Sequence, residues 1–344
     1  REVAEQWNSF CDVHGAGVRN PGAHTAGFLE RFLEALADCT AKLYLSPPNE
    51  SAPVPKISDL AAESARSRAL LTDVAEVFQS IPVEWRSLYE APIRLTYDSN
   101  RFDFCTPVKA MFECPDGMSL GNLHELERGA DHDPCPPLRK GMLLAGRRLP
   151  RERNGSKSRN HNKKEWTSMP AYHRFIEVYN RFIRDELLPF IGCAAGLGRG
   201  VDAVVQASPV LRVVMPSAHV ATNLHRDGEY GHIFEELNVW IPLSRSWGSN
   251  SLYVETFPDQ GDYAPFEGDL GEAFLWWGNQ CRHYAVANRT DGTRVSFDFR
   301  LVPKHFWDAA ETAGVVAEMA RGRQRVHFGA MQVGSYYKFH AAGR

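Results

Sequence analysis

The sequence predicts a mainly β protein, a sandwich or a barrel, with helices before and after the β region. Residues 1–205 carry apolar side chains at helical spacing, for example at Phe28, Phe32 and Leu36. From Val210 onward, short segments rich in β-branched and aromatic residues alternate with Gly, Pro, Asn and Asp. Short strands separated at regular intervals by turn residues are typical of sandwiches and barrels.

The individual elements follow from the same patterns. We expect helices over Leu60 to Val77 and Tyr172 to Ile191, and a strand between Ile93 and Phe104. Another helix is expected over 307–321. The strands expected in the β region are 210–215, 236–243, 251–256, 272–277, 283–287 and 294–302.

We expect one structural domain with three parts. Residues 206–304 would form the β core, residues 1–205 a helical region packed on it, and residues 305–344 a C-terminal helix and tail. Within the first part, the segment 139–164 is rich in Lys and Arg and poor in bulky apolar residues, which predicts an exposed, mobile loop. A basic run can also contact nucleic acid or phosphate. Because this run has no interleaved aromatic residues, the solvated loop is the favoured interpretation.

The composition places the protein in a broad class. The chain has 344 residues, 43% of them hydrophobic and 24% charged, with a formal net charge of −3. These values are typical of a soluble globular protein and predict no general attraction to nucleic acid or to membranes. The 7 cysteines contain no C-x-x-C pair, which fits reduced thiols. We therefore expect a cytoplasmic protein with no membrane partner.

Three residues could form a metal site. His225 and Asp227 are two positions apart, so on a strand or at its extended end they point to the same side. His283 opens a later β-like segment and would complete a set of two histidines and one carboxylate. That set suits a redox-active ion and leaves three coordination positions open, whereas zinc prefers a tetrahedral set. His232 could replace one of the histidines in an alternative scheme.

The segment after His283 predicts an anion site. Its polar residues alternate with apolar ones, so one strand face carries Arg294, Ser296, Asp298 and Arg300, and the other carries Val295, Phe297, Phe299 and Leu301. If the apolar face packs against helices, the polar face must line a cavity, because buried charges need partners. Arg294 can form a bidentate pair with a carboxylate, and Ser296 can add a hydrogen bond.

The ordered pattern H-x-D, distal His and R-x-S resembles that of the iron(II)/2-oxoglutarate oxygenases, over about Val210 to Val302. The resemblance implies a double-stranded β-helix, or jelly-roll, fold that uses Fe(II), 2-oxoglutarate and O2. The implied metal ligands are His225, Asp227 and His283. The implied co-substrate contacts are Arg294, Ser296 and, as a further polar contact, Asn238.

Several short segments are similar to the small-molecule members of that family in secondary metabolism, including streptomycin-biosynthesis-type members. These segments are Asn238 to Trp240, Gly248 to Leu252, Gly278-Asn279 and Asn288 to Thr290. The resemblance implies hydroxylation, desaturation or oxidative ring closure of a small polar metabolite such as an amino acid. It argues against halogenation, because halogenating members have a small residue in place of the carboxylate. The candidate substrate contacts are Arg212, Glu236, Trp240 and Arg300.

Two other functions are compatible with the sequence. The first is a jelly-roll module that binds a metal or a ligand without catalysis, although such a module does not need an R-x-S after the distal histidine. The second is an oxygenase that acts on a macromolecule and uses the basic segment 139–164 to hold it. Binding through phosphate contacts would weaken steeply with salt.

Overall fold

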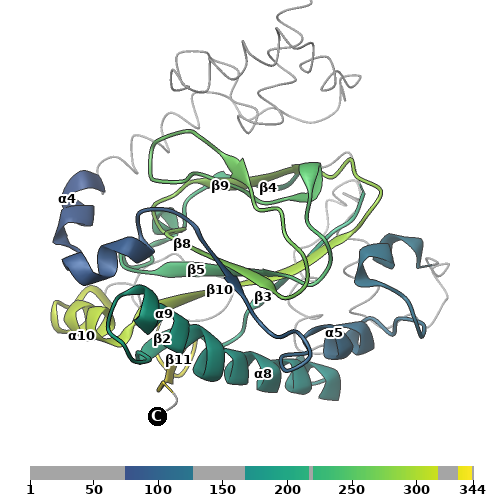
Figure 1. Cartoon of the computed structure of the whole chain (residues 1–344), viewed down its shortest axis with the longest axis horizontal. Coiled ribbons are helices and arrows are strands. Elements are labelled where there is room, and N and C mark those ends of the chain that lie inside the picture. The colour runs from purple at the N-terminus through teal and green to yellow at the C-terminus, as the bar shows by residue number, and fades with distance from the viewer. Residues whose placement is uncertain (1–73, 127–166, 217–219, 317–331, 343–344) are drawn as a thin grey trace, which may run out of the picture.

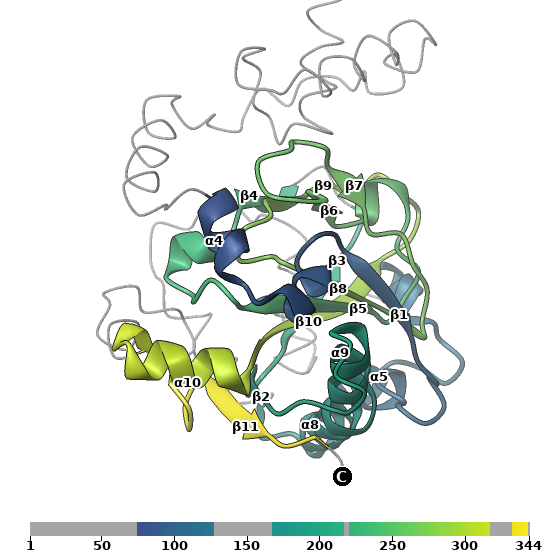
Figure 2. The same cartoon turned by 60° about the vertical axis from the view of Figure 1, so that its left-hand side comes forward.

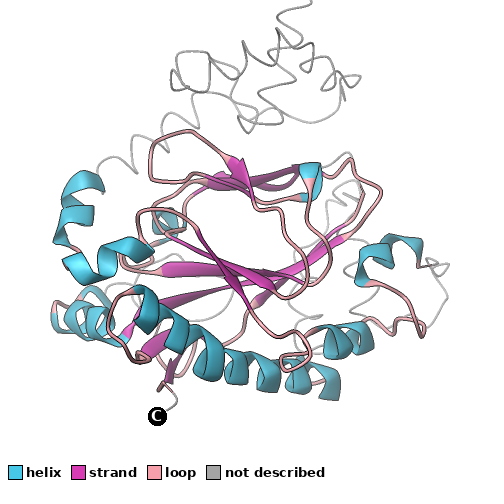
Figure 3. Cartoon of the chain, in the orientation of Figure 1, coloured by secondary structure: helices cyan, strands magenta, loops and turns pink. Residues whose placement is uncertain are grey.

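The computed structural model describes residues 74–126, 167–216, 220–316 and 332–342. Two antiparallel sheets face each other, and helices cover the outer side of the larger one (Figure 1 and Figure 3). The early helical stripe around Phe28 and the basic segment 139–164 lie outside the described residues. The expectations for those two segments therefore stay expectations.

The larger sheet has seven strands, and all of its pairings are antiparallel. Its main order is β1 (Ile93–Thr96), β8 (Glu272–Trp276), β5 (Leu237–Pro242), β10 (Arg294–Pro303), β2 (Ala203–Gln206) and β11 (Tyr337–His340), and β3 (Val210–Val214) also pairs with β10. The smaller sheet has the order β4 (Val220–His225), β9 (His283–Ala287), β6 (Tyr253–Val254) and β7 (Ala264–Pro265).

From β3 to β10 the chain crosses repeatedly between the two sheets. The strands β3, β5, β8 and β10 belong to the larger sheet, whereas β4, β6, β7 and β9 belong to the smaller one. The result is a pairing order β3-β10-β5-β8 that faces β4-β9-β6-β7. Strand β10 lies centrally in the larger sheet, so one of its faces is directed at the smaller sheet.

The outer face of β10 explains why the helices lie where they do. The helices are α8 (Pro170–Phe182), a π-helical turn (Ile183–Leu187) and α9 (Leu188–Ala194), and two views place them on the side away from β4 and β9 (Figure 1 and Figure 2). The ring of Phe297 lies 5.2 Å from that of Phe175, and the ring of Phe299 lies 4.9 Å from that of Tyr179. Burying these large rings is a major source of stability, and the apolar face of β10 packs against helices as predicted.

Shorter elements complete the described fold. They are α4 (Val74–Ser80), η3 (Val83–Leu88), α5 (Cys105–Met111), η4 (Leu120–Glu125), η6 (Asp227–Tyr230), η7 (Gly248–Asn250) and α10 (Lys304–Thr312). Among the described residues, no helix is long and apolar enough to cross a membrane. The C-terminal helix begins at Lys304 and not at Trp307.

All six strands predicted in the β region are present, although 251–256 contributes only the two residues of β6. The strand expected between Ile93 and Phe104 is confined to Ile93–Thr96. The sequence patterns missed β2, β4, β7 and β11. The protein is therefore mainly antiparallel β with flanking helices, as expected.

Candidate functional site

The three residues predicted to bind metal lie together between the sheets. His225 ends β4, Asp227 follows two residues later in η6, and His283 begins β9, where it is the register partner of His225. One potential ligand atom from each residue lies within 4.8 Å of the others. Asp227 Oδ1 is 3.7 Å from His225 Nε2 and 3.8 Å from His283 Nε2. The group can hold a metal ion.

Hydrogen bonds orient both imidazoles for this task. The Nδ1 atom of His225 lies 2.8 Å from the carbonyl oxygen of Asn223, and that of His283 lies 3.1 Å from the carbonyl oxygen of Cys281. A carbonyl can only accept, so Nδ1 carries the proton in each ring and Nε2 keeps its lone pair. Burial and the nearby His225 lower the pKa of His283 to about 4, which keeps this ring in the neutral form that binds metals.

The carboxylate of Asp227 is held from the side opposite the histidines. Its Oδ2 atom accepts hydrogen bonds from Arg300 Nε at 2.8 Å and from Asn238 Nδ2 at 2.7 Å. Burial alone would raise the pKa of Asp227, but the positive charge of Arg300 holds this pKa well below its ordinary value. Asp227 is therefore ionised and ready to bind a cation.

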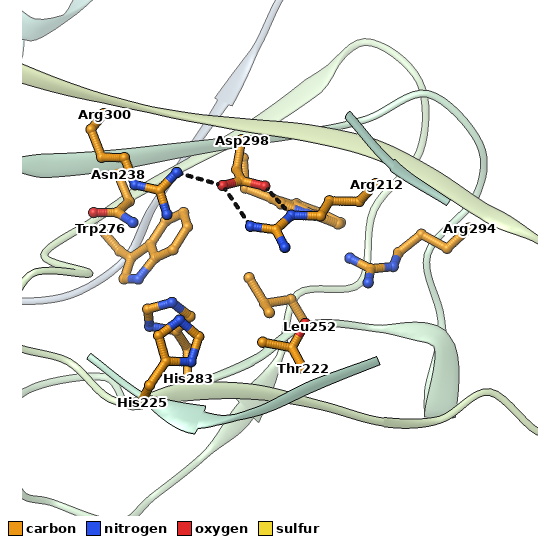
Figure 4. A pocket seen from close by; sticks show the side chains of 11 residues that line it. Arg212, Thr222, His225, Asn238, Leu252, Trp276, His283, Arg294, Asp298 and Arg300 are labelled. Atoms are coloured by element: carbon orange, nitrogen blue, oxygen red, sulfur yellow. Dashed lines mark hydrogen bonds and ion pairs between the residues drawn. The ribbon is translucent and has the colours of Figure 1, made fainter. Parts of the chain in front are cut away.

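A chain of charged groups continues from Arg300 along the polar face of β10. Arg300 Nη1 donates to Asp298 Oδ2 at 2.8 Å, and Arg212 Nε of β3 donates to Asp298 Oδ1 at 2.7 Å (Figure 4). Burial opposes ionisation of Asp298, but these two arginines lower its pKa. Asp298 therefore has a cation on each side.

Arg294 differs from the other arginines of the site. Its side chain is buried, with 2% of the residue exposed, yet no carboxylate of the described residues forms a salt bridge with it. Nη1 lies 3.3 Å from the Ser296 hydroxyl, Nε has no hydrogen-bond partner, and Cζ lies 5.6 Å from the ring centre of Trp240. Burial and the nearby charge of Arg212 lower the pKa of Arg294 to about 9.

Most of the predicted site residues line one cavity between the sheets. Figure 4 shows His225 and His283 side by side at one end and the guanidinium of Arg294 at the other. The residues that line it are Arg212, Thr222, His225, Asn238, Trp240, Leu252, Trp276, His283, Arg294, Asp298 and Arg300. Thr222 and Leu252 were not predicted, because an isolated Thr or Leu carries no signal that separates pocket wall from core, whereas the sequence left Trp276 open as core or pocket wall.

Three predicted residues, Asp227, Glu236 and Ser296, are absent from this lining, and one alternative is not supported. Glu236 is fully buried, with its carboxylate 2.7 Å from His232 Nδ1 and hydrogen-bonded by the Tyr337 hydroxyl. It therefore does not face the cavity as a substrate contact would. Ser296 is also fully buried and meets the cavity only through Arg294. His232 pairs with Glu236 and is not part of the potential metal group.

Over part of its length the chain is similar to a known protein. No family model matches the chain. Over 113 residues the chain is 35% identical to the streptomycin biosynthesis protein StrG of Streptomyces griseus, which corresponds to 33% of this chain and 53% of that protein. The chain thus spans about half the length of the curated relative that it matches.

Solved structures with local similarity were also found. They include the non-haem monooxygenase ThoJ as a nickel complex, with 20% identity over 33% of this chain and 50% of that chain and a TM-score of 0.29. The non-haem α-ketoglutarate-dependent epimerase SnoN from nogalamycin biosynthesis shares 15% identity over 37% of this chain and 56% of that chain, with a TM-score of 0.29. CytC3 with Fe(II) and α-ketoglutarate shares 11% identity over 62% of this chain and 74% of that chain, with a TM-score of 0.35. The similar proteins are thus non-haem metal or α-ketoglutarate proteins and a protein of streptomycin biosynthesis.

Proposed function

We propose that the chain is an oxygenase that depends on non-haem Fe(II) and 2-oxoglutarate and is built on a double-stranded β-helix. The fold proposal is supported by the eight strands β3 to β10, which lie in two facing antiparallel sheets. The chain crosses between the sheets at every connection except that from β6 to β7. The metal group lies at adjoining strand ends of one sheet, and the unpaired arginine lies on the other.

The observation that carries the proposal is Arg294, a buried cation that has no counter-anion among the described residues and lies in the same cavity as a potential metal site. A buried charge is costly unless it is paired. A ligand that offers Arg294 a carboxylate would remove that cost, and its other end would reach the metal group. 2-Oxoglutarate has both features, because its 2-oxo acid end chelates iron and its distal carboxylate is free.

In this proposal the residues have separate tasks. His225, Asp227 and His283 would hold Fe(II) and leave three coordination positions open. When bound together, iron and 2-oxoglutarate supply the oxidising chemistry by activating dioxygen. Arg294 binds the distal carboxylate in a bidentate manner, and the Ser296 hydroxyl fixes the guanidinium from behind. The walls of Trp240 and Trp276, both almost fully buried, exclude water from the reacting centre.

We propose a small polar metabolite, such as an amino acid, as the primary substrate, and hydroxylation, desaturation or oxidative ring closure as the outcome. Arg212 supports this choice, because its side chain is 38% exposed and lines the cavity while two of its nitrogens bind Asp298. Its remaining nitrogen could meet a substrate anion. The local identity with the streptomycin biosynthesis protein is compatible with a role in secondary metabolism, in the cytoplasm.

The experiment is succinate release by the chain with Fe(II), 2-oxoglutarate and oxygen, across a panel of free amino acids and other small metabolites. We expect one class of metabolites to stimulate succinate formation well above the uncoupled background. If the metal-loaded chain neither binds 2-oxoglutarate nor forms succinate with any member, it is a metal-binding module and not an oxygenase. Segment 139–164 lies outside the described residues. A salt titration would test whether the chain uses it to hold a macromolecule, because binding through phosphate contacts weakens steeply with salt.

A further inference from the structure

Two cavity-lining residues that were expected to contact ligands also bind the candidate metal ligand Asp227. Arg300 was a candidate for the substrate and Asn238 for the co-substrate, but both donate to the same atom, Asp227 Oδ2, at 2.8 Å and 2.7 Å. The other carboxylate oxygen, Oδ1, is the one that faces Nε2 of His225 and of His283. The two oxygens of Asp227 thus have different surroundings.

We propose that Arg300 and Asn238 are positioning residues that restrict Asp227 to a single metal–oxygen bond, made by Oδ1. A carboxylate oxygen has about two lone-pair directions, and the two hydrogen bonds to Oδ2 occupy both. One of them comes from a guanidinium and is charge-assisted, which makes it short and strong. Oδ2 therefore has no lone pair left to offer to a metal.

The number of bonds made by Asp227 determines what else can bind. In an octahedral site, two histidines and one single-oxygen carboxylate leave three open positions. A carboxylate that chelates through both oxygens would leave two, which a 2-oxo acid alone would fill. Arg300 and Asn238 thus keep a third position for dioxygen. This consequence rests on the proposed function, whereas the single-oxygen geometry does not.

The two donors are themselves held in place. Arg300 Nη1 donates to Asp298 Oδ2 at 2.8 Å, and Gln206 Oε1 lies 3.4 Å from the same nitrogen. The Asn238 side chain lies against Gly278, where an added Cβ would come within 2.4 Å of its Cγ atom. Position 278 therefore has to be glycine for Asn238 to reach Asp227. Such outer partners are known to set the orientation of metal ligands.

The test counts the water molecules on a bound metal and uses Mn2+ as the probe. Mn2+-bound water is measured by the relaxation of solvent protons, and equilibrium dialysis gives the amount of bound ion. The variants are Arg300→Met, Asn238→Leu and the double variant, each without 2-oxoglutarate. Arg212→Met is the matched control, because it removes an arginine that binds Asp298 but not Asp227.

We expect the relaxation per bound Mn2+ to fall by about a third in the double variant, since an octahedral site would go from three open positions to two. Each single variant should fall by less, and Arg212→Met should match the wild type. The same relaxation in the wild type and in every folded variant would overturn the proposal, and so would an equal fall in Arg212→Met.

Folding of the variants does not limit the test. If Arg300→Met does not fold, Asn238→Leu and Gly278→Ala decide, because both keep every charge of the site and both remove the Asn238 bond to Asp227. The water count also needs no co-substrate. A normal water count in a protein that fails to bind 2-oxoglutarate would contradict the proposed function and leave the role of Arg300 and Asn238 intact.

Discussion

The polar face of β10 carries a buried arginine near each end, and the two arginines differ in whether they pair with carboxylates. Arg294 begins the strand and Arg300 lies six positions later, and both are buried, with 2% and 8% exposure. Arg300 binds two carboxylates, those of Asp227 and Asp298. Among the described residues, Arg294 forms a hydrogen bond with the Ser296 hydroxyl and lies over the Trp240 ring, but pairs with no carboxylate. Burial acts against the charge of both residues, but the carboxylates raise the pKa of Arg300, whereas that of Arg294 falls to about 9.

This difference separates an arginine that is paired within the fold from an arginine that is available to pair with a bound ligand. A buried arginine with two carboxylate partners is satisfied by the fold itself, so its role is to hold those partners in place. A buried arginine with no carboxylate is satisfied only when something else brings one. Residues whose charge is strained by their surroundings often mark functional sites. From this comparison we propose that Arg300 holds the metal ligand Asp227 and that Arg294 binds the co-substrate.

The largest expected effect on activity comes from replacing the candidate metal ligands, which lie near Arg300. Asp227→Ala and His283→Ala should each abolish succinate formation, because a site with three protein ligands cannot lose one and still hold the metal firmly. Metal content and succinate formation should fall together, with the far-UV circular dichroism retained. His232→Gln is the control, since His232 lies outside the group. Full activity in metal-replete His283→Ala would exclude His283 as a ligand.

The next effect concerns the affinity for 2-oxoglutarate. Arg294→Gln should lower it by roughly 30-fold to several thousand-fold, because truncating one partner of a buried charged pair costs about 2 to 5 kcal/mol. Arg294→Lys keeps the charge but loses the bidentate geometry, so its loss should be smaller. The measurement is the dissociation constant for 2-oxoglutarate at matched metal loading.

Arg300→Gln sharpens this measurement, because Arg300 lies on the same strand face. It should change the affinity for 2-oxoglutarate much less than Arg294→Gln does. The reverse order would mean that Arg300 is the anchor. If neither variant binds 2-oxoglutarate less tightly, another co-substrate is used.

The third prediction is that replacing Arg294 and replacing Arg300 change the free energy of unfolding in opposite directions. Without metal and co-substrate, Arg294→Met should raise the free energy of unfolding, by about 1 to 4 kcal/mol, the range seen when apolar residues replace buried ionic groups. Arg300→Met should lower it by about 3 to 5 kcal/mol, because Asp227 is left as an uncompensated buried charge. Urea unfolding of both variants measures the two changes. Changes of the same sign would remove the distinction between the two arginines.

The residue types and strand faces of this site could be predicted from the sequence, but the ion pairs between its residues could not. The alternation from Arg294 to Leu301 predicted both the helix-covered face and the cavity face of β10, because side chains on a strand alternate by geometry. The spacing of His225 and Asp227, with His283 at the start of a later β-like segment, predicted a cluster, since alternate residues on a strand point to the same side. These features depend on local spacing and on side-chain chemistry.

The pairing of the two arginines could not be predicted, because it depends on what neighbouring strands bring opposite each of them. Arg300 meets Asp227 across the space between the sheets, and the alternation along β10 places both arginines on one face without indicating which of them meets a carboxylate. Strand β11 was missed for a similar reason, since its pairing with β2 joins residues far apart in the chain. Tertiary contacts decide both features.

The smallest expected effect concerns a second buried pair near the Arg300 end. His232 Nδ1 lies 2.7 Å from the carboxylate of Glu236, and both side chains are almost fully buried. Burial opposes protonation of His232, but the charge and hydrogen bond of Glu236 outweigh it, so the pKa of His232 is raised above its ordinary value. The folded metal-free protein therefore holds this proton more tightly than the unfolded chain does.

The sign of the pH dependence follows from that difference. The stabilisation by His232 is fully present below the unfolded pKa of about 6.5 and is lost as the pH rises through the higher folded pKa. Its size should be about 1.5 to 3 kcal/mol, as for a hydrogen bond to a charged group. Urea unfolding of the wild type and His232→Gln between acidic and alkaline pH measures it. The two stability curves should converge as the pH rises, and curves that stay parallel throughout would show that His232 is not the protonated partner.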